Sequence, residues 1–269
     1  MSWGKDVSPH KGEAVVKEIL TVHTSYLDLE FESPYIAVNA RPGQFVMIRG
    51  WNRGHPILLR PFDVVTVDKE RGTFRIVVKI TGQGTRLLGE LSPGDRVTVI
   101  GPLGKGVEIP EPAGSGSLGF LVRGVGSAAV VFLAERAGEL GVPTRIYFSA
   151  ADSSRLVCRE YLEAITKEVH IATDDGSEGY KGDARDLVDP AVQRGEIDRL
   201  YTCGSRRFAR YVQEVTRKKL TKGYLFLEGY MACGIGDCHG CAVKKAGSED
   251  YYLVCRDGPV FPAEAVEIE

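Results

Sequence analysis

Four cysteines near the C-terminal end of this 269-residue chain have a spacing that suits iron binding. Cys233, Cys238 and Cys241 form a C-x4-C-x2-C pattern, and Cys255 follows after thirteen further residues. This is the plant-type spacing of a [2Fe–2S] cluster, in which one loop supplies three thiolates and a later segment supplies the fourth. A structural zinc site and disulfide bonds are the alternatives. Zinc sites favour two C-x2-C pairs, and this segment has one.

The loop between these cysteines is rich in glycine, at Gly234, Gly236 and Gly240. Glycine adopts positive φ readily, which lets the loop turn its amides toward sulfur and stabilise negative charge. His239 lies in the same loop, and a histidine ligand would raise a cluster's potential. Because four cysteines are available, we expect His239 to be a neighbour of the cluster at a partner surface, not a ligand.

A second group of informative residues lies in the first hundred residues. Arg60-Pro61-Phe62-Asp63 opens a predicted strand, and Gly82-Gln-Gly84-Thr85 opens a predicted helix. Arginine binds pyrophosphate through two parallel hydrogen bonds, and a glycine turn before a helix offers free amides to the same group. The two motifs together predict a dinucleotide site. Phe62 either lies near a flavin ring or belongs to the core.

A third group predicts a nucleotide site in the following part of the chain. Gly124-Val-Gly126 lies between a predicted buried strand and a helix, where a nucleotide pyrophosphate binds in α/β folds. Tyr201-Thr-Cys203-Gly204 follows the last predicted strand, at the carboxyl edge where such sheets bind ligands. Residues 174–176 and 181–182 form a loop that is either part of this edge or simply solvated.

The elements that must position these residues follow two different patterns. Short strands separated by turn signals predict a small antiparallel barrel, with one helix near 85–90; the strands are 14–20, 26–31, 44–49, 62–67, 73–80 and 96–100. After a Pro-, Gly- and Ser-rich connection at 109–117, strands alternate with helices, which predicts a parallel, Rossmann-like α/β sheet. Its strands are 118–122, 144–150, 169–172 and 199–202, and its helices 128–137, 159–167, 185–193 and 208–218.

The remaining segment contains the cysteine loop and a hairpin-like stretch at 251–254. We therefore expect a multidomain β plus α/β protein with a barrel domain at 1–110, an α/β nucleotide domain at 111–222 and a small cluster domain at 223–269.

Composition excludes several classes of function. The net charge of −2 and the pI of about 6.3 give no basic field for nucleic acid or an anionic membrane. The longest apolar stretch, around 125–134, is too short to span a bilayer, and the polar residues 1–13 lack the apolar core of a signal peptide. Cysteines used as cluster ligands indicate a reducing compartment, so we expect a cytoplasmic protein. Cys158 is expected to be an apolar packing residue.

Taken together, the motifs resemble a known family over nearly the whole chain. The flavin half of the ferredoxin reductase superfamily is similar at residues 42–48, 59–62, 82–85, 91–95 and 101–104. The electron-transfer subunits of dihydroorotate dehydrogenase B are similar at residues 173–177, 203–204, 227–228, 231–236 and 254–261.

The resemblance implies FAD in the barrel, NAD(H) on the α/β domain and a [2Fe–2S] cluster bound by the four cysteines. The FAD contacts carried over by position are Arg60, Pro61, Phe62, Asp63, Val77, Val78, Lys79, Gly84 and Thr85. The nucleotide contacts are expected at Gly124, Gly126, Cys203 and Gly204. The implied partner is a catalytic, FMN-containing subunit in an α2β2 heterotetramer that oxidises dihydroorotate in pyrimidine biosynthesis. The chain itself would contribute no catalytic residue and would act as an electron conduit.

The sequence departs from the family pattern at both cofactor sites. Asp63 replaces a serine or threonine whose hydroxyl can bond the flavin N5. An ionised aspartate only accepts hydrogen bonds and would lower the flavin potential, unless it faces solvent and its backbone amide serves instead.

At the nucleotide site, Arg123 replaces a glycine, and Ala129 and Ser205 each replace a proline. These changes put nicotinamide binding in question, although Arg123 could bind a phosphate. Ser153-Ser154-Arg155 could accept a 2′-phosphate, which would favour NADP, or could be a solvated helix start.

Two other functions compete with this interpretation. One is a homologous flavin and iron–sulfur subunit of a bifurcating NADH–ferredoxin oxidoreductase, a sulfide dehydrogenase or a soluble hydrogenase. The other is a non-redox binding module that kept the fold and binds zinc at the cysteines.

Overall fold

The computed structural model describes residues 8–51, 54, 56–109 and 117–268. Its chain forms two compact units. The first unit joins residues 1–108 with 228–242 and 253–259, and the second contains 109–227, 243–252 and 260–269. The predicted connection at 109–117 falls almost wholly outside the described residues, and the three-domain division with its boundaries at 110 and 222 stays a prediction.

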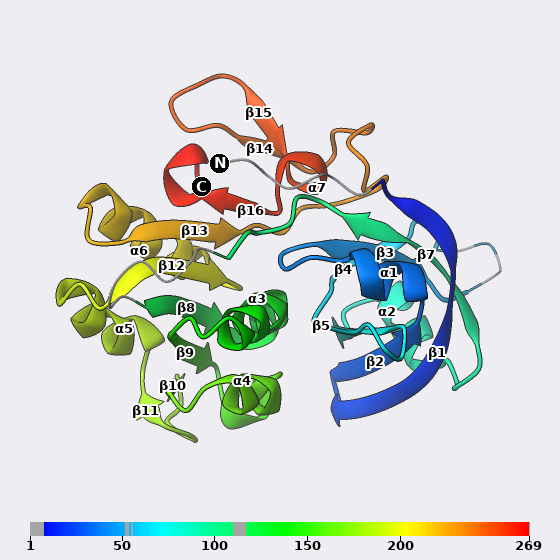
Figure 1. Ribbon diagram of the computed structural model, residues 1–269, viewed down its shortest axis with the longest axis horizontal. Helices are drawn as coiled ribbons and strands as arrows, with labels where there is room; N and C mark the ends of the chain where they lie inside the picture. The colour runs from blue at the N-terminus through cyan, green and yellow to red at the C-terminus, as the bar shows by residue number, and fades with distance from the viewer. Residues whose placement is uncertain (1–7, 52–53, 55, 110–116, 269) are drawn as a thin grey trace. The chain divides into compact units, whose positions relative to one another are not determined.

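The first unit is built on a seven-stranded sheet in the order β4-β3-β7-β1-β2-β6-β5, with antiparallel pairing along it. The sheet curls, so that β4 also contacts β6, and the predicted antiparallel architecture is confirmed (Figure 1). Its strands are β1 (His10–His23), β2 (Tyr26–Glu32), β3 (Phe45–Arg49), β4 (Arg60–Asp63), β5 (Thr66–Asp68), β6 (Thr73–Lys79) and β7 (Arg96–Leu103).

Two predictions for this unit were wrong in detail. The segment 62–67 is not one strand but two, because the chain changes its pairing partner in the middle: the Val64 amide donates to the Gln44 carbonyl at 3.1 Å, and the Val65 amide donates to the Arg75 carbonyl at 2.9 Å. Besides the predicted helix, found as α2 (Gln83–Gly89), there is a second short helix, α1 (Pro34–Asn39). It begins with a proline in its first turn, where the missing amide hydrogen costs nothing.

The second unit is a predominantly parallel sheet in the order β11-β10-β9-β8-β12-β13-β16. Its parallel strands are β8 (Ser117–Arg123), β9 (Thr144–Ala150), β10 (Val169–Thr173), β11 (Tyr180–Lys181), β12 (Ile197–Cys203) and β13 (Lys222–Phe226), and β16 (Val260–Pro262) is antiparallel to β13. The helices are α3 (Ala128–Glu139), α4 (Arg159–Ile165), α5 (Ala184–Gln193) and α6 (Arg206–Arg217). The predicted α/β architecture is confirmed, and β11, β13 and β16 are additions to it.

The order of the strands explains the layers of this unit. From β8 the chain moves outward to β9 and β10, then returns past β8 to β12 and β13. Right-handed crossovers therefore put α3 and α4 on one face and α5 and α6 on the other, and the two helices of each pair contact each other (Figure 1).

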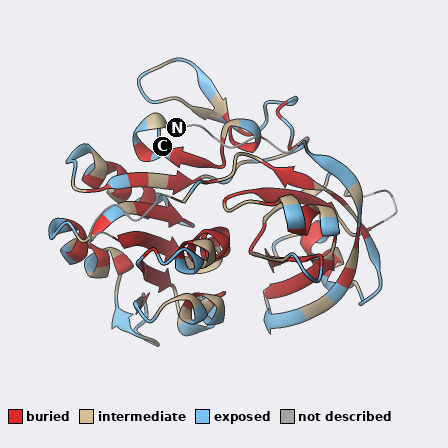
Figure 2. Ribbon diagram, viewed as in Figure 1, coloured by how far each residue is buried: buried red, intermediate tan, exposed pale blue. Residues whose placement is uncertain are grey.

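Each unit has its own buried core, shown in red along the strands in Figure 2. Phe31 stacks on Phe74 in the first unit with ring centroids 5.5 Å apart, and Phe120 stacks on Tyr201 in the second at 5.4 Å. Near the C-terminus, β14 (Ala242–Lys244) and β15 (Tyr251–Leu253) form the expected small hairpin-like sheet, and Val254, predicted to continue it, instead begins helix α7 (Val254–Asp257). Among the described residues, no helix combines the length and apolar character needed to cross a membrane.

Candidate iron–sulfur, flavin and nucleotide sites

The four predicted cluster ligands come together as two pairs in the first unit. Cys241 and Cys255 are buried, with their sulfur atoms 3.3 Å apart. The Val254 amide donates to the Cys241 carbonyl, and the Cys255 amide donates to the Cys241 sulfur at 3.4 Å, which fixes the start of α7 against the loop. In the other pair, the amide of the exposed Cys238 donates to the half-buried Cys233 sulfur at 3.4 Å.

Hydrogen bonds from backbone amides lower the pKa of these thiols, and burial raises it. Desolvation raises the pKa of Cys233, but hydrogen bonds from backbone amides, those of Cys238, Ile235 and Asp237 among them, outweigh it and lower the pKa to about 6. Burial raises the pKa of Cys255, and the neighbouring Cys241 and Cys233 raise it further. The loop therefore favours a thiolate at Cys233, while Cys255 needs a cation to hold its charge.

The positive φ predicted for the loop glycines is found at two of the three positions. Gly234 and Gly236 have positive φ, at 73° and 95°. Gly240 does not: the left-handed residue is His239, with φ of 57°, and the Ala242 amide closes this turn onto the His239 carbonyl at 3.2 Å. His239 therefore has a conformational role in the loop that its sequence position did not reveal.

The paired arrangement fits a binuclear cluster. A structural zinc site needs four ligands around a single ion, whereas a [2Fe–2S] cluster shares four cysteines between two irons. Cys233, Cys238, Cys241 and Cys255 are thus the residues that would hold it.

On the curled sheet, Arg60 and Gly84 are brought together as predicted. A side chain at Gly84 would lie 3.1 Å from the Arg60 Nε and 3.0 Å from the ring of Trp51. The Arg60 guanidinium lies over the Trp51 ring, 5.9 Å from its centroid, and its Nη1 donates to the Leu58 carbonyl at 2.6 Å. Trp51, which the sequence motifs did not indicate, is therefore a third component of this site. Its indole nitrogen is held by the Pro56 carbonyl.

Other predicted flavin contacts have internal partners. The Thr85 hydroxyl accepts the amides of Thr81 and Gly82 and donates to the Gly82 carbonyl, so it caps its own helix. Val77 and Val78 are buried, and Lys79 is exposed. Pro61 and Phe62 are half-buried on β4, where they face Met47 and Val46 of β3 across the ladder. All of them stay predicted FAD contacts.

Asp63 is the last residue of strand β4, and its carboxyl group changes its protonation state near neutral pH. It is partly buried, and burial together with the nearby Glu228 raises its pKa to about 7. A carboxyl group that holds its proton near neutrality donates as well as accepts hydrogen bonds. The two sequence-based alternatives for Asp63, a charged acceptor at the flavin and a solvent-facing side chain, stay predictions.

At the carboxyl end of the parallel sheet, two predicted glycines are required by packing. A side chain on Gly126 would lie 2.6 Å from the Gly204 Cα, and one on Gly204 would lie 2.3 Å from the Arg123 carbonyl oxygen. Cys203 is buried and is the last residue of β12. The sequence predicted this strand to be the last of the parallel sheet, but β13 follows it. Gly124, with φ of 52°, is half-buried and has open space where a side chain would lie, and Gly204 is exposed.

The residues that depart from the family pattern at this edge are either buried or bonded to other residues of the second unit. Ala129 is buried in α3, and the Ser205 hydroxyl accepts the Phe208 amide at 3.4 Å as the N-cap of α6. In 153–155, a short 3₁₀ turn, the Ser153 amide donates to the Ser177 hydroxyl at 2.8 Å and Arg155 pairs with Asp152 at 3.1 Å. Arg123 forms an ion pair with Asp174, described below.

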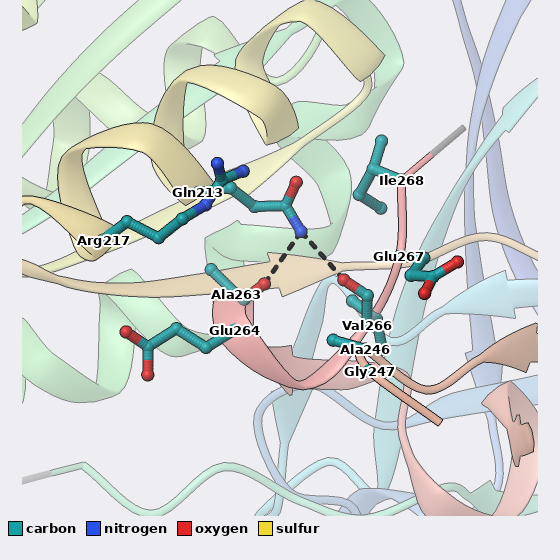
Figure 3. A pocket seen from close by; sticks show the side chains of 9 residues that line it. All are labelled: Gln213, Arg217, Ala246, Gly247, Ala263, Glu264, Val266, Glu267 and Ile268. Carbon is teal, nitrogen blue, oxygen red and sulfur yellow. Dashed lines mark hydrogen bonds between the residues drawn. The ribbon is translucent and has the colours of Figure 1, made fainter. Parts of the chain in front are cut away.

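A separate pocket lies in the second unit, between α6 and the C-terminal segment (Figure 3). The Gln213 side-chain nitrogen donates to the carbonyls of Ala263 and Val266, both at 2.9 Å, and so ties that segment to the helix. None of the residues predicted to bind a cofactor lines this pocket.

Comparison with known proteins identifies the family. A family model described as the iron–sulfur cluster binding domain of dihydroorotate dehydrogenase B matches residues 228–267, and one described as an oxidoreductase FAD-binding domain matches residues 12–107. The electron transfer subunit of dihydroorotate dehydrogenase B (NAD(+)) from Desulforamulus reducens is 32% identical over 253 residues, 93% of this chain and 96% of the relative. The chain belongs to the family of dihydroorotate dehydrogenase B electron-transfer subunits.

A second member of this family, from Bacillus caldolyticus, is 37% identical over 84% of this chain and 86% of its own. Among solved structures, a chain of an NADH-dependent reduced ferredoxin–NADP oxidoreductase, studied for flavin-based electron bifurcation, has a TM-score of 0.84 at 28% identity and covers 95% of this chain and 90% of its own. A ferredoxin reductase of carbazole 1,9a-dioxygenase shares the fold, with a TM-score of 0.65 at 20% identity over 81% of this chain and 70% of its own. The predicted family, fold class and oxidoreductase assignment are confirmed, as are FAD and iron–sulfur cluster binding.

Proposed function

We propose that this chain is an electron-transfer subunit that passes electrons between NAD(H) and a catalytic partner flavin, through FAD and a [2Fe–2S] cluster, for the oxidation of dihydroorotate to orotate. One observation supports this most: two cysteine pairs lie in the same compact unit as the Arg60, Gly84 and Trp51 group.

FAD can exchange electrons in pairs or singly, and an iron–sulfur cluster exchanges them one at a time. The protein's contribution is to bind and tune these groups. Arg60 offers its guanidinium to a pyrophosphate. The backbone amides of Cys238 and Cys255 donate to the sulfur atoms of Cys233 and Cys241 and stabilise negative charge there.

A catalytic partner is part of this proposal because the curated relatives are described as electron transfer subunits of an NAD(+) dihydroorotate dehydrogenase. An FMN-containing subunit, the α2β2 assembly and the cytoplasmic location stay predictions. Isolation of the complex and its mass in solution would test the stoichiometry.

The first test is an anaerobic titration of the purified protein with NADH and then NADPH, followed by visible absorption and electron paramagnetic resonance. We expect the flavin band to bleach and a reduced [2Fe–2S] signal to appear. Both groups present and reducible by dithionite but inert to either nucleotide would contradict nicotinamide use. Colourless protein without iron or acid-labile sulfide would support the zinc alternative.

Two cysteine variants test the assignment of the cluster ligands. Cys255→Ser removes a buried member of the 3.3 Å pair, so iron, labile sulfide and the resonance signal are expected to be lost while FAD stays bound. Cys158→Ala changes another buried cysteine, in the second unit, and is expected to retain full iron content. An unchanged iron content in Cys255→Ser would show that Cys255 is not the fourth cluster ligand.

One observation favours a second candidate, a subunit of a bifurcating NADH–ferredoxin oxidoreductase: the structural match at a TM-score of 0.84 covers nearly the whole of both chains. The two functions differ in their partner. Co-purification of a flavoprotein that oxidises dihydroorotate supports the first, and co-purification of one that couples NADPH to ferredoxin supports the second.

A further inference from the structure

Arg123 holds three strand ends of the second unit together. It is the last residue of β8, and its Nη1 donates to the Ser149 hydroxyl on β9 at 3.0 Å. The same guanidinium forms a two-pronged ion pair with Asp174, the residue after β10, through Nη1 at 3.1 Å and through Nη2. These are adjacent strands whose carboxyl ends meet at one edge (Figure 1).

The carboxylate of Asp174 is held by its ion pair with Arg123 and is not buried. Its side chain is 46% exposed, whereas that of Arg123 is 20% exposed. The ion pair with Arg123 lowers the pKa of Asp174, and the charge of Arg207 lowers it further. The Asp174 backbone is anchored separately, through its amide to the Ala150 carbonyl at 3.0 Å, so the carboxylate can leave Arg123 without moving the strand end.

The surroundings of this pair suit a phosphate. A carboxylate and a phosphate bind a guanidinium in the same two-pronged geometry. Gly124, next to Arg123, has open space beside it. The turn after the first strand of a parallel α/β sheet is the place where nucleotide phosphates bind.

We infer that Arg123 binds a phosphate group of the nicotinamide nucleotide, and that Asp174 occupies the position of that phosphate until the nucleotide displaces it. The inference rests on the proposed nucleotide function. Asp174 would then set the affinity for the nucleotide by competing for Arg123. The competing explanation is a purely structural ion pair that ties β8 to β10.

The test measures dissociation constants of NADH and NADPH for the full-length protein with its cofactors bound. Asp174→Asn frees Arg123 and is expected to tighten binding roughly fivefold, and Arg123→Ala is expected to weaken it roughly tenfold. Asp175→Asn is the matched control, because Asp175 accepts hydrogen bonds from Ser177 at 2.9 and 2.7 Å, and its binding should stay within about twofold of the parent.

The two nucleotides distinguish the source of the phosphate. Equal effects on NADH and NADPH indicate the pyrophosphate, and an effect on NADPH alone indicates the 2′-phosphate. If the parent binds NADH or NADPH but Asp174→Asn leaves both constants unchanged, the ion pair is structural and the inference fails while the proposed function stands. If neither the parent nor Asp174→Asn binds either nucleotide, the nicotinamide function itself fails. Binding by Asp174→Asn alone would support the inference directly.

Discussion

The carboxyl of Asp63 makes the stability of the folded chain depend on pH. Its pKa is about 7 in the folded protein against 3.8 in a solvated chain, so the folded state binds the extra proton between these values. Stability from this residue is therefore fully present below about pH 4 and is lost as the pH rises to about 7. We expect Asp63→Asn to be more stable than the parent at pH 8, by on the order of 1–2 kcal/mol after allowance for partial exposure, and equal to it near pH 4.

Thermal unfolding midpoints of the two proteins across this pH range check the prediction. Glu228→Gln is the informative control, because Glu228 is the second cause of the raised pKa and its removal should move the pH dependence to lower pH. A stability difference between Asp63→Asn and the parent that does not change with pH would rule out this account.

Among single residues, the sequence predicts those whose motif lies within a short stretch of the chain. The cysteine pattern is readable because three ligands lie within nine residues. The contacts of Trp51 with Arg60 and of Asp174 with Arg123 could not be predicted, because folding creates them: Asp174 is 51 residues from Arg123 in the sequence. The raised pKa of Asp63 could not be predicted either, since it depends on burial and on Glu228, which is remote in sequence.

Among the elements, strands β1, β2 and β6 are joined by a buried charge network centred on Arg75. Its guanidinium bonds Asp28 at 2.9 Å, contacts Glu18 and lies 3.7 Å from Glu30. The side chains of Asp28 and Glu30 are only 5% and 6% exposed. Removing a cation from buried carboxylates is costly, so Arg75→Ala is expected to lower the free energy of unfolding by about 2–4 kcal/mol.

Arg71 provides the matched comparison, because it pairs with the same Glu30 at 3.0 Å but is 61% exposed. Its ion pair is screened by solvent, so Arg71→Ala should cost at most about 1 kcal/mol. Urea unfolding of the two variants gives both values. Equal losses would mean that burial does not decide the strength of these pairs.

Elements were predictable where one pattern governs a whole segment. The apolar run of β8, the strand β9 and the apolar helix α3 were found from sequence with small errors at their ends. The division of 62–67 into β4 and β5 was not, because Val64 and Val65 turn from one neighbouring strand to another, which depends on tertiary pairing. Helix α1 has only six residues, too few for a clear period.

For the molecule as a whole, the grouping of the cysteine segments with the curled sheet has a consequence for unfolding. Residues 228–242 and 253–259 belong to the first unit, and Gly234 packs so closely there that a side chain would lie 2.8 Å from the Met47 Cγ. If cluster and sheet share one unit, loss of the cluster should destabilise the sheet as well, because ligand binding stabilises the unit that binds it. If residues 223–269 formed an independent domain, loss of the cluster would leave the stability of the sheet unchanged.

The chain offers separate probes for the two cases. Trp51 belongs to the first unit, whereas helices α3 to α6 belong to the second unit and contain most of the helical residues. In Cys255→Ser we expect the midpoint followed by tryptophan fluorescence to fall by about 5 °C or more, and the midpoint followed by helical circular dichroism to change less. An unchanged tryptophan midpoint, together with loss of iron, would show that the cluster segment folds apart from the sheet and would support the three-domain division.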